Sequence, residues 1–318
     1  MQTRQLGHTD IQLTPIGLGC WQFSDGKALT GAYWPKLGQE LTNDIVKATL
    51  DGGVNWFDTA EAYGWGASEA GLAKALQQEG ATTVRIATKW FPPLRFASSI
   101  TKTIHKRLQF LDGYPIDLHQ IHAPYGSFSS RKRQLDAMAE LVQQGHIRAI
   151  GVSNYNAAQL KQAYKHLEKK GIPLASNQIQ YNLLQRQADH NGTIQMAKEL
   201  GISIIAYSPL AQGLLTGKFH ADPSLIKQRV GPRKRMSAFS AKGLQKSAPV
   251  VEVLQRIAAA KGVEPSQVAL RWLLQVHGDT ILAIPGATKV RHAQNNAQTQ
   301  DFQLTEEEMS ALHQITQA

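Results

Sequence analysis

The sequence predicts an α/β fold, a (β/α)8 TIM barrel that forms a single domain over residues 1–318. Three observations predict it: eight short apolar runs alternate with helical stretches, several helical stretches end at glycine, and no linker or low-complexity tract divides the chain. Alternating strands and helices favour a parallel sheet, and closing eight strands into a barrel leaves no sheet edge exposed. A doubly wound open sheet is the alternative.

Each apolar run is short enough for a buried strand and is bounded by turn or helix signals. The expected strands lie at 16–19, 55–59, 84–88, 118–122, 149–152, 176–179, 202–206 and 281–284. The expected helices carry apolar residues at helical spacing and lie at 42–51, 68–78, 99–111, 134–144, 157–170, 191–200, 248–260 and 265–276. Gly52, Gly145 and Gly171 follow three of these helices and suit the left-handed turn that ends a helix.

Two segments fall outside this alternation. Residues 4–16 contain a Thr-Asp turn, which predicts an N-terminal hairpin that caps the bottom of the barrel. Residues 213–246, after the seventh strand, form a long irregular loop, which is typical of a lid or binding loop. Between 218 and 246 this loop carries eight Lys or Arg against a single acidic residue, Asp222. We call residues 218–246 the basic segment.

Composition limits the classes of function. The net charge is +10, and its concentration in the basic segment favours a local anion site over a broad nucleic-acid surface. No apolar run is long enough to span a membrane, and the N-terminus lacks the apolar stretch of a signal peptide. Cys20 is the only cysteine, which fits a reducing compartment. We therefore expect a cytoplasmic protein with no nucleic-acid or membrane partner and no metal site, and the sequence leaves its oligomeric state open.

Reactive side chains of such barrels lie at the carboxyl ends of the strands. Four residues there form a chemically coherent group: Asp58, Tyr63, Lys89 and His122. A lysine beside a tyrosine favours the phenolate and lowers the pKa of the tyrosine, and an aspartate holds the lysine in place. A histidine orients a substrate carbonyl by hydrogen bonding. Singly, each residue also suits a cap, a packing position or a solvated strand end, so their joint position indicates the site.

Several motifs surround these residues in a fixed order. They are Asn55-Trp-Phe-Asp58-Thr-Ala-Glu-Ala-Tyr63-Gly64, Ala87-Thr-Lys89 and Asp117-Leu-His-Gln-Ile-His122, followed by matches at 151–154, 177–182, 206–210 and 284–289. With these motifs the chain resembles the aldo-keto reductase family, from residue 17 to about residue 296. The resemblance implies a catalytic tetrad of Asp58, Tyr63, Lys89 and His122. It also implies an NADPH-dependent oxidoreductase that reduces aldehydes and ketones to alcohols, with Tyr63 as the general acid.

The same resemblance implies a dinucleotide site along the strand ends. Ser153, Asn154 and Gln178 would bind the nicotinamide carboxamide, and Tyr207 would stack under the ring. The pyrophosphate would lie against Ser208, Pro209, Leu210, Gly213 and Lys218. The adenosine end would lie against Gly286, Thr288, Lys289, His292, Asn295 and Asn296. Trp21 and Asp58 would also border the cofactor, and the small carbonyl substrate would contact Trp21, Tyr63, Trp90 and His122.

The residues themselves favour NADPH over NADH. No Gly-x-Gly-x-x-Gly follows an early strand, so the usual Rossmann site is absent. Thr288 and Lys289, close to the basic segment, supply the donors and the cation that a 2′-phosphate needs. An NADH site more often carries an acidic residue for the ribose hydroxyl.

One alternative function stays open. The sequence also resembles the branch of the family that contains potassium-channel β subunits, which predicts a regulatory subunit that binds the cofactor. The complete tetrad favours catalysis. The loops that shape the pocket carry no readable code for the physiological substrate.

Overall fold

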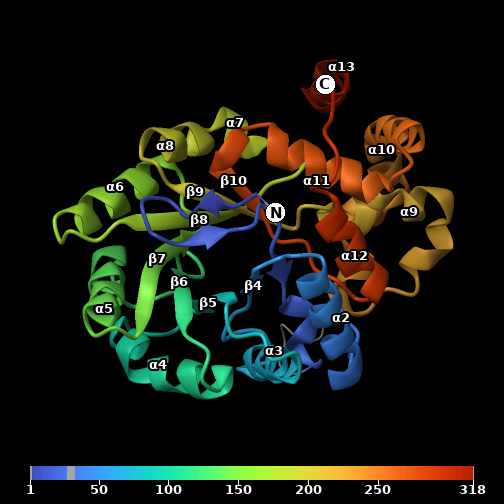
Figure 1. The fold of residues 1–318 in the computed structure, drawn as a ribbon. Coiled ribbons are helices and arrows are strands. Elements are labelled where there is room, and N and C mark those ends of the chain that lie inside the picture. Colours follow the sequence, from blue (N-terminus) through green and yellow to red (C-terminus); the bar gives the residue numbers. More distant parts are fainter. Residues whose placement is uncertain (1, 27–32, 318) are drawn as a thin grey trace.

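Eight parallel strands form the centre of the molecule in the computed structural model, which describes residues 2–26 and 33–317 (Figure 1). In chain order they are β3 (Leu18–Gly19), β4 (Trp56–Asp58), β5 (Arg85–Trp90), β6 (Ile116–Ile121), β7 (Ile147–Ser153), β8 (Leu174–Gln180), β9 (Ser203–Tyr207) and β10 (Ile281–Ala283). Each strand pairs with the next, and bridges from Ile16 to Ala283 and from Gly19 to Gly286 join the first strand to the last. The predicted barrel is therefore confirmed, and each strand overlaps its predicted range.

Helices surround the strands (Figure 1). They are α2 (Gln39–Asp51), α3 (Ala67–Gln78), α4 (Ser98–Leu111), α5 (Arg131–Gln143), α6 (Ala157–Glu168), α7 (Gln187–His190), α8 (Thr193–Glu199), α10 (Ala241–Lys261), α11 (Pro265–Gln275), α12 (Val290–Gln298) and α13 (Glu306–Gln317). The outward faces of the strands and the apolar faces of these helices form the main core, in which Cys20 is fully buried. No helix in the described residues is both long and apolar enough to cross a membrane.

The N-terminal hairpin closes one end of the barrel. Strands β1 (Arg4–Gln5) and β2 (Gln12–Leu13) pair in antiparallel fashion, as predicted. Leu6, Ile11 and Leu13 pack against side chains of the barrel interior, including Trp56 and Leu118. Because this end is filled with apolar side chains, the polar chemistry belongs at the opposite end, where the strands finish.

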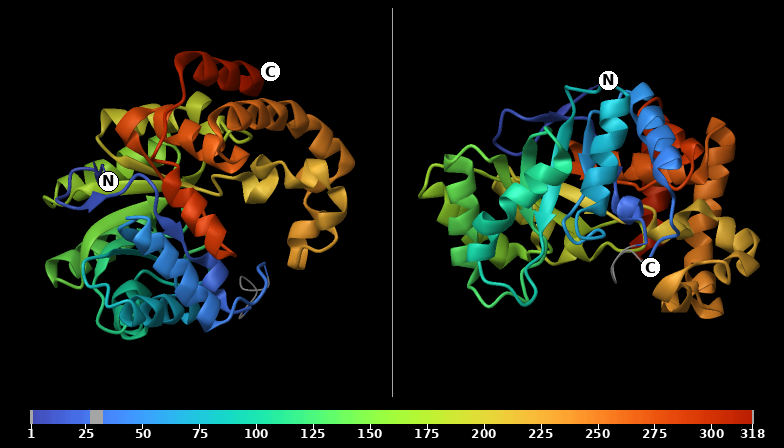
Figure 2. Two further views of the ribbon diagram at one scale, coloured as in Figure 1. Left: turned by 45° about the vertical axis from the view of Figure 1, so that its right-hand side comes forward. Right: turned by 90° about the horizontal axis from the view of Figure 1, so that it is seen from below.

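The segment between β9 and α10 differs from the irregular loop predicted for 213–246. It forms a series of short helices: η2 (Ala211–Thr216), α9 (Lys218–Ala221), η3 (Pro223–Ile226), η4 (Gly231–Arg235) and η5 (Ser237–Phe239). Helix α10 begins at Ala241, earlier than predicted, because the side chain of Ser240 caps it by accepting a hydrogen bond from the N–H of Gly243. Figure 2 shows this segment and α10 as an arm at the side of the barrel.

Candidate functional site

Asp58 and Lys89 form a buried ion pair inside the barrel. They lie on the neighbouring strands β4 and β5, and Lys89 Nζ is 2.5 Å from Asp58 Oδ1. The ammonium also donates to the carbonyl of Thr59 at 2.8 Å. The second oxygen of Asp58 accepts hydrogen bonds from the amide nitrogens of Gln120, at 3.1 Å, and Gln178, at 2.8 Å. These contacts compensate the carboxylate for its burial and fix the position of Lys89.

Gln120 reaches Asp58 because residue 151 on β7 is a glycine. A Cβ atom at Gly151 would lie 2.8 Å from Gln120 Cγ and 2.4 Å from Ser176 Oγ. Both distances are too short for a real contact, so any side chain at 151 would displace the amide that supports the carboxylate. Gln120 is a site residue that the sequence analysis missed, although it occupies an inward position of β6, like Lys89 on β5.

Tyr63 follows β4 and points its hydroxyl at Lys89, with an Nζ to Oη distance of 3.4 Å. Burial raises the pKa of Tyr63, and Lys89 opposes that rise, so the net pKa lies above the ordinary value. Lys89 acts in the predicted direction, but burial outweighs it. Burial alone would lower the pKa of Lys89, but Asp58 and Tyr63 raise it by more. The net pKa therefore lies above the ordinary value, and the ammonium stays charged. The pair therefore holds a protonated phenol against a cation at neutral pH.

His122 lies directly after β6, next to Tyr63. The two rings meet edge to face with their centroids 5.7 Å apart. Burial, and then the charge of Lys89, lowers the pKa of His122 to about 3, so the imidazole is neutral. Its Nδ1 atom is buried and has no hydrogen-bond partner within the described residues. All four predicted catalytic residues thus come together, with a neutral histidine beside the phenol.

Two tryptophans were expected at the substrate pocket, and the structure places only one of them beside Tyr63. Trp21, in η1 (Trp21–Ser24), stacks on Tyr63 with a centroid distance of 5.7 Å. Trp90 lies on the opposite face of β5 from Lys89, because successive side chains of a strand alternate. It is buried in the outer core, and its indole N–H donates to Ser99 Oγ at 3.0 Å. This corrects the expectation that Trp90 lines the pocket.

Phe91 occupies the place beside His122, with its ring centroid 5.9 Å from the imidazole. The sequence analysis missed it because no motif marks it. A shift of one residue at the end of a strand turns a side chain from the outer core toward the barrel mouth.

The residues expected at the nicotinamide form one hydrogen-bonded chain. Ser153 Oγ donates to the carbonyl of Gln178 at 2.9 Å, and Asn154 Nδ2 donates to Ser153 Oγ at 3.0 Å. The hydroxyl of Tyr207 donates to Asn154 Oδ1 at 3.1 Å. The side-chain nitrogen of Gln178 points to Asp58, so this amide supports the ion pair as well as bordering the expected cofactor position.

The expected pyrophosphate residues follow β9 in an unusual backbone conformation. Ser208 has a φ of +50°, and its carbonyl accepts a hydrogen bond from Asn182 Nδ2 at 2.9 Å. Pro209 is buried, Leu210 is half-buried, and Gly213 has a φ of +95°. A Cβ atom at Gly213 would lie 3.8 Å from Lys218 Nζ, which places this cation beside the glycine turn. The turn therefore places the backbone at Gly213, which has no side chain of its own, beside the positive charge of Lys218.

The residues expected at the adenosine end surround the start of α12. The N–H of Thr288 donates to His292 Nδ1 at 3.4 Å. Burial, and then Lys218, Arg291 and Lys289, lowers the pKa of His292 to about 4. His292 is therefore neutral near pH 7 and supplies no second cation in this state. The remaining expected residues are Gly286 and Asn295, both half-buried, and Asn296, whose buried Nδ2 has no partner among the described residues.

The basic segment contains two buried arginines, Arg229 and Arg233. The guanidinium of Arg229 lies 3.4 Å from the ring centroid of Phe239, and that of Arg233 lies 3.7 Å from the centroid of Trp34. Burial lowers the pKa of both arginines to about 10, still well above neutral pH. Nε of each has no hydrogen-bond partner in the part of the chain described. Buried cations with free donors are suited to an anionic ligand.

The chain matches the family model described as Aldo/keto reductase family over residues 15–317. It belongs to the aldo/keto reductase family. An uncharacterised oxidoreductase of Mycobacterium tuberculosis is 34% identical over 307 residues, covering 96% of this chain and 90% of that protein. The chloroplastic pyridoxal reductase of Arabidopsis thaliana is 30% identical, covering 95% of this chain and 83% of its own.

Solved structures of aldo/keto reductases share the fold. The glycerol dehydrogenase of Gluconobacter oxydans superposes with a TM-score of 0.84 at 27% identity, covering 98% of this chain and 94% of its own. A thermostable aldo-keto reductase in complex with the inhibitor epalrestat gives a TM-score of 0.78 at 28% identity, covering 99% and 100%. This aldo/keto reductase is therefore an oxidoreductase with the family's barrel.

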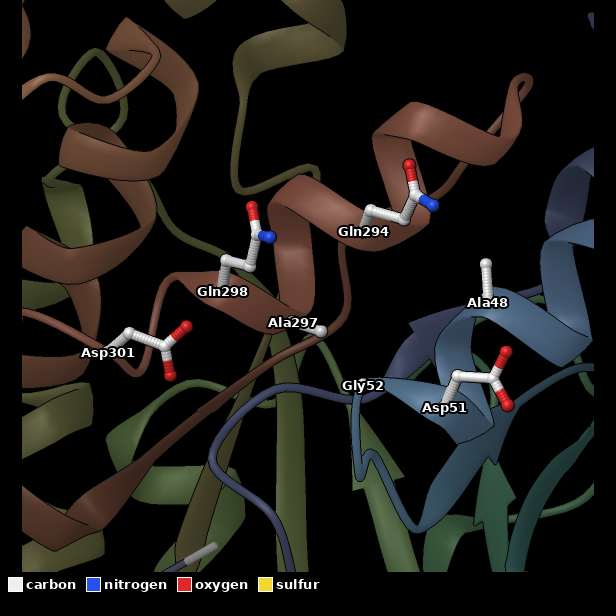
Figure 3. Close-up of a pocket in the computed structure, with 7 residues that line it drawn as sticks. All are labelled: Ala48, Asp51, Gly52, Gln294, Ala297, Gln298 and Asp301. Atoms are coloured by element: carbon white, nitrogen blue, oxygen red, sulfur yellow. The ribbon is translucent and has the colours of Figure 1, made fainter.

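A separate hollow lies on the outside of this aldo/keto reductase, between α2 and α12 (Figure 3). It encloses about 250 Å³. Asp51 and Asp301 border it, and Ala297 packs against Gly52, where a Cβ atom would lie 2.4 Å from the alanine methyl group. None of the tetrad residues lines this hollow. In the described residues no group of three or more His, Cys, Asp or Glu could hold a metal ion.

Proposed function

We propose that this protein is an NADPH-dependent reductase of aldehydes and ketones, with Tyr63 as the proton donor. One observation carries the proposal: in a single buried site, Lys89 Nζ is 2.5 Å from Asp58 Oδ1 and 3.4 Å from Tyr63 Oη. The neutral ring of His122 lies beside the same hydroxyl. This arrangement suits proton transfer to an oxygen that is becoming an alkoxide.

NADPH held by the residues at the strand ends would supply a hydride to the carbonyl carbon and would leave as NADP+, while the electrons of the C=O π bond pass to the carbonyl oxygen. The carbonyl oxygen takes the proton of Tyr63, which leaves a phenolate, and the product is an alcohol. Lys89 stabilises that phenolate by its charge, and Asp58 keeps Lys89 in place. His122 donates a hydrogen bond that orients the carbonyl, and solvent returns a proton to Tyr63 after the product leaves.

The side chains at the strand ends fit a dinucleotide phosphate. Lys218 lies close to several like charges: burial lowers its pKa, and Arg229, Arg233, Lys289 and Arg291 lower it further. Within the described part of the chain no carboxylate forms an ion pair with these cations, and like charges gathered in this way are stabilised when an anion binds. We assign Arg229, Arg233 and Lys218 to the pyrophosphate, and Lys289 with Thr288 to the 2′-phosphate. Ser153, Asn154 and Tyr207 are assigned to the nicotinamide, as the resemblance implied.

The relatives support carbonyl substrates of several kinds. One similar protein is named a pyridoxal reductase and a similar structure is that of a glycerol dehydrogenase, so aromatic aldehydes and polyol-derived ketones both belong in a substrate screen. The complete tetrad favours turnover over the regulatory role predicted as an alternative, because cofactor binding alone requires no proton donor.

The test is a screen of NADPH oxidation with aldehydes, ketones, ketoses and pyridoxal, with the alcohol product identified by mass spectrometry. We expect stoichiometric alcohol formation with at least one aldehyde. Binding of NADPH without oxidation by any carbonyl would contradict the proposal and favour the regulatory subunit.

A further inference from the structure

Exposed apolar side chains gather around one part of the barrel mouth. Within the described residues six large apolar side chains are exposed, and five of them lie on the loops that follow β4, β5 and β6. These five, which we call the apolar rim, are Trp65, Leu94, Phe96, Tyr125 and Phe128. The sixth is Met236, which directly follows η4 in the basic segment. Single exposed apolar residues are ordinary, but a contiguous group at a site marks a binding surface.

The rim is held in a fixed shape. The N–H of Leu94 donates to the carbonyl of Gly126 at 2.8 Å, and the N–H of Phe128 donates to the carbonyl of Arg95 at 3.0 Å. These two bonds join the loops after β5 and β6. The rings of Phe96 and Phe128 lie across this junction with centroids 5.2 Å apart. The exposed side chains therefore belong to one paired structure.

A buried carboxylate ties the rim to the reactive centre. Glu61 lies between Asp58 and Tyr63 in the chain and accepts a hydrogen bond from the N–H of Phe91 at 2.6 Å. The same carboxylate forms ion pairs with Arg95 and with Arg107, the latter at 3.3 Å. Arg95 is itself part of the rim's backbone pairing. The loop that carries Tyr63 and the loops of the rim thus share one anchor.

The position of Leu94 is unfavourable for a leucine in the folded chain. Its φ is +59°, a conformation that leucine seldom adopts, and its side chain is 79% exposed. Asparagine or glycine would adopt that backbone conformation more readily, and neither would expose an apolar side chain to water. Neither the local conformation nor packing in the core favours a leucine here, and contact with an apolar ligand would explain it.

Through Trp65, a chain of aromatic rings connects the rim to the catalytic residues. Trp65 lies edge to face on Phe91 with centroids 6.1 Å apart, and Phe91 lies 5.9 Å from His122. His122 in turn contacts Tyr63. A ligand whose carbonyl reaches Tyr63 would therefore extend outward over a continuous aromatic wall. A membrane surface or a second copy of the protein would contact the outer rim but would not extend along these rings to the reacting atoms.

We propose that the apolar rim binds the apolar tail of the carbonyl substrate, so that the preferred substrates carry a long alkyl or an extended aryl group. The inference rests on the proposed function and adds a substrate class to it. Each methylene that the rim covers raises kcat/KM by about two- to fourfold.

The experiment measures kcat/KM for straight-chain aldehydes from propanal to decanal with the full chain and NADPH. We compare Leu94→Asn, Phe96→Ser and Phe128→Ser with the control Met236→Ser, which removes an exposed apolar side chain outside the rim. In the wild type and the control the ratio of decanal to propanal should be large. In the rim variants this ratio should fall about tenfold. An unchanged ratio in all three rim variants overturns the proposal.

Two other measurements separate the alternatives. If the rim variants instead lose binding to anionic lipid vesicles, or change from oligomer to monomer, while the decanal ratio is unchanged, the rim is a membrane or self-association surface and the proposal is wrong. If no aldehyde oxidises NADPH, the proposed function fails, and calorimetry with decan-1-ol and propan-1-ol still tests the rim. Tighter binding of decan-1-ol that the rim variants lose supports the apolar site, and equal binding of both alcohols overturns it.

Discussion

The guanidinium of Arg233 lies 3.7 Å from the ring centroid of Trp34, and its Nη1 donates to the carbonyl of Tyr33 at 2.9 Å. The contact joins the basic segment to a loop 200 positions earlier in the chain. Both aromatic rings pack on Trp21, with centroid distances of 6.0 Å and 5.1 Å, and Trp21 stacks on Tyr63. A residue assigned to the cofactor phosphates is thereby connected to the wall beside the proton donor.

Arg233→Ala should therefore affect the cofactor and the aromatic wall together. A charge-assisted contact contributes about 1.5–3 kcal/mol, so the dissociation constant for NADPH should rise about ten- to hundredfold. Arg233→Lys should recover only part of the loss. A lysine keeps the charge, but it does not stack on an aromatic ring or donate two parallel hydrogen bonds as a guanidinium does. Calorimetric titration measures both. Lys234→Ala, at the exposed neighbouring cation, is the control, and an equal loss there would show a general effect of charge.

Tyr63→Phe retains the ring that stacks on Trp21 and removes only the hydroxyl. General acid catalysis contributes about 10²–10⁴-fold, so kcat should fall by that factor while NADPH affinity stays nearly the same. Steady-state kinetics and calorimetry test the two parts. Turnover close to that of the wild type would contradict the assignment of Tyr63 as proton donor.

Lys89→Met should act through the pKa of Tyr63. Lys89 favours the phenolate, so its removal raises the pKa of a phenol that burial has already raised. In the direction of alcohol oxidation the phenolate is the base, and the rise of kcat with pH should therefore move to higher pH. The pH profile of oxidation in the wild type and the variant is the measurement, with thermal unfolding to check the integrity of the site. An unchanged profile would show that Lys89 serves only to pair with Asp58.

Glu69, on α3, predicts a pH dependence of stability. It is fully buried, and Arg107 lies 3.3 Å from its Oε2. Burial raises its pKa from 4.5 to about 7, and Arg107 opposes the rise only in part. Between these pH values the folded chain holds a proton that the unfolded chain has released. The stability from this group is therefore complete below pH 4.5 and is lost as the pH rises through 7.

The size of the effect follows from the two pKa values. Relative to Glu69→Gln, the wild-type free energy of unfolding should fall by about 3 kcal/mol between pH 4.5 and pH 8. Urea denaturation over this range measures it, and Glu40→Gln, at an exposed position of α2, is the matched control. Parallel curves for the wild type and Glu69→Gln would contradict a raised pKa at Glu69.

The sequence predicted the barrel and the tetrad because both depend on simple geometry. Short apolar runs identify strands, and neighbouring parallel strands bring their carboxyl ends together, so Asp58 and Lys89 had to meet. Trp90 and Phe91 could not be told apart, since one residue decides which face of β5 a side chain takes.

Other features depend on contacts between distant segments. The short helices of the basic segment span only three to five residues each, which is too short for a periodic pattern to show in the sequence. Helix α12 does carry Val290, Ala293 and Ala297 at helical spacing, and the sequence analysis missed it. The burial of Arg229 and Arg233 comes from stacking on Phe239 and Trp34, and charge along the chain alone predicts exposed side chains. The neutral state of His292 likewise results from burial in the folded chain and from cations of two separate segments.

We expect the choice between NADPH and NADH to depend on Lys289. The two cofactors differ only in the 2′-phosphate, which carries about −1.5 to −2 charges, by analogy with other phosphomonoesters. Lys289 is exposed at the start of α12, and its charge lowers the pKa of both Lys218 and His292. It therefore lies close to the cluster assigned to the phosphates. Since His292 is neutral near pH 7, it supplies no substitute for this cation.

Lys289→Ala should therefore raise the dissociation constant for NADPH about tenfold, a loss at the lower end for a charge-assisted contact because the side chain is solvated, and leave that for NADH almost unchanged. Added salt should weaken NADPH binding more than NADH binding in the wild type and remove most of that difference in the variant, since the lost contact is electrostatic and exposed to solvent. Titration of both cofactors into the wild type, Lys289→Ala and the control Lys242→Ala measures the effect. Equal wild-type affinities for the two cofactors would contradict the preference for NADPH. An equal loss for both in Lys289→Ala would move this cation to the part of the site that the two cofactors share.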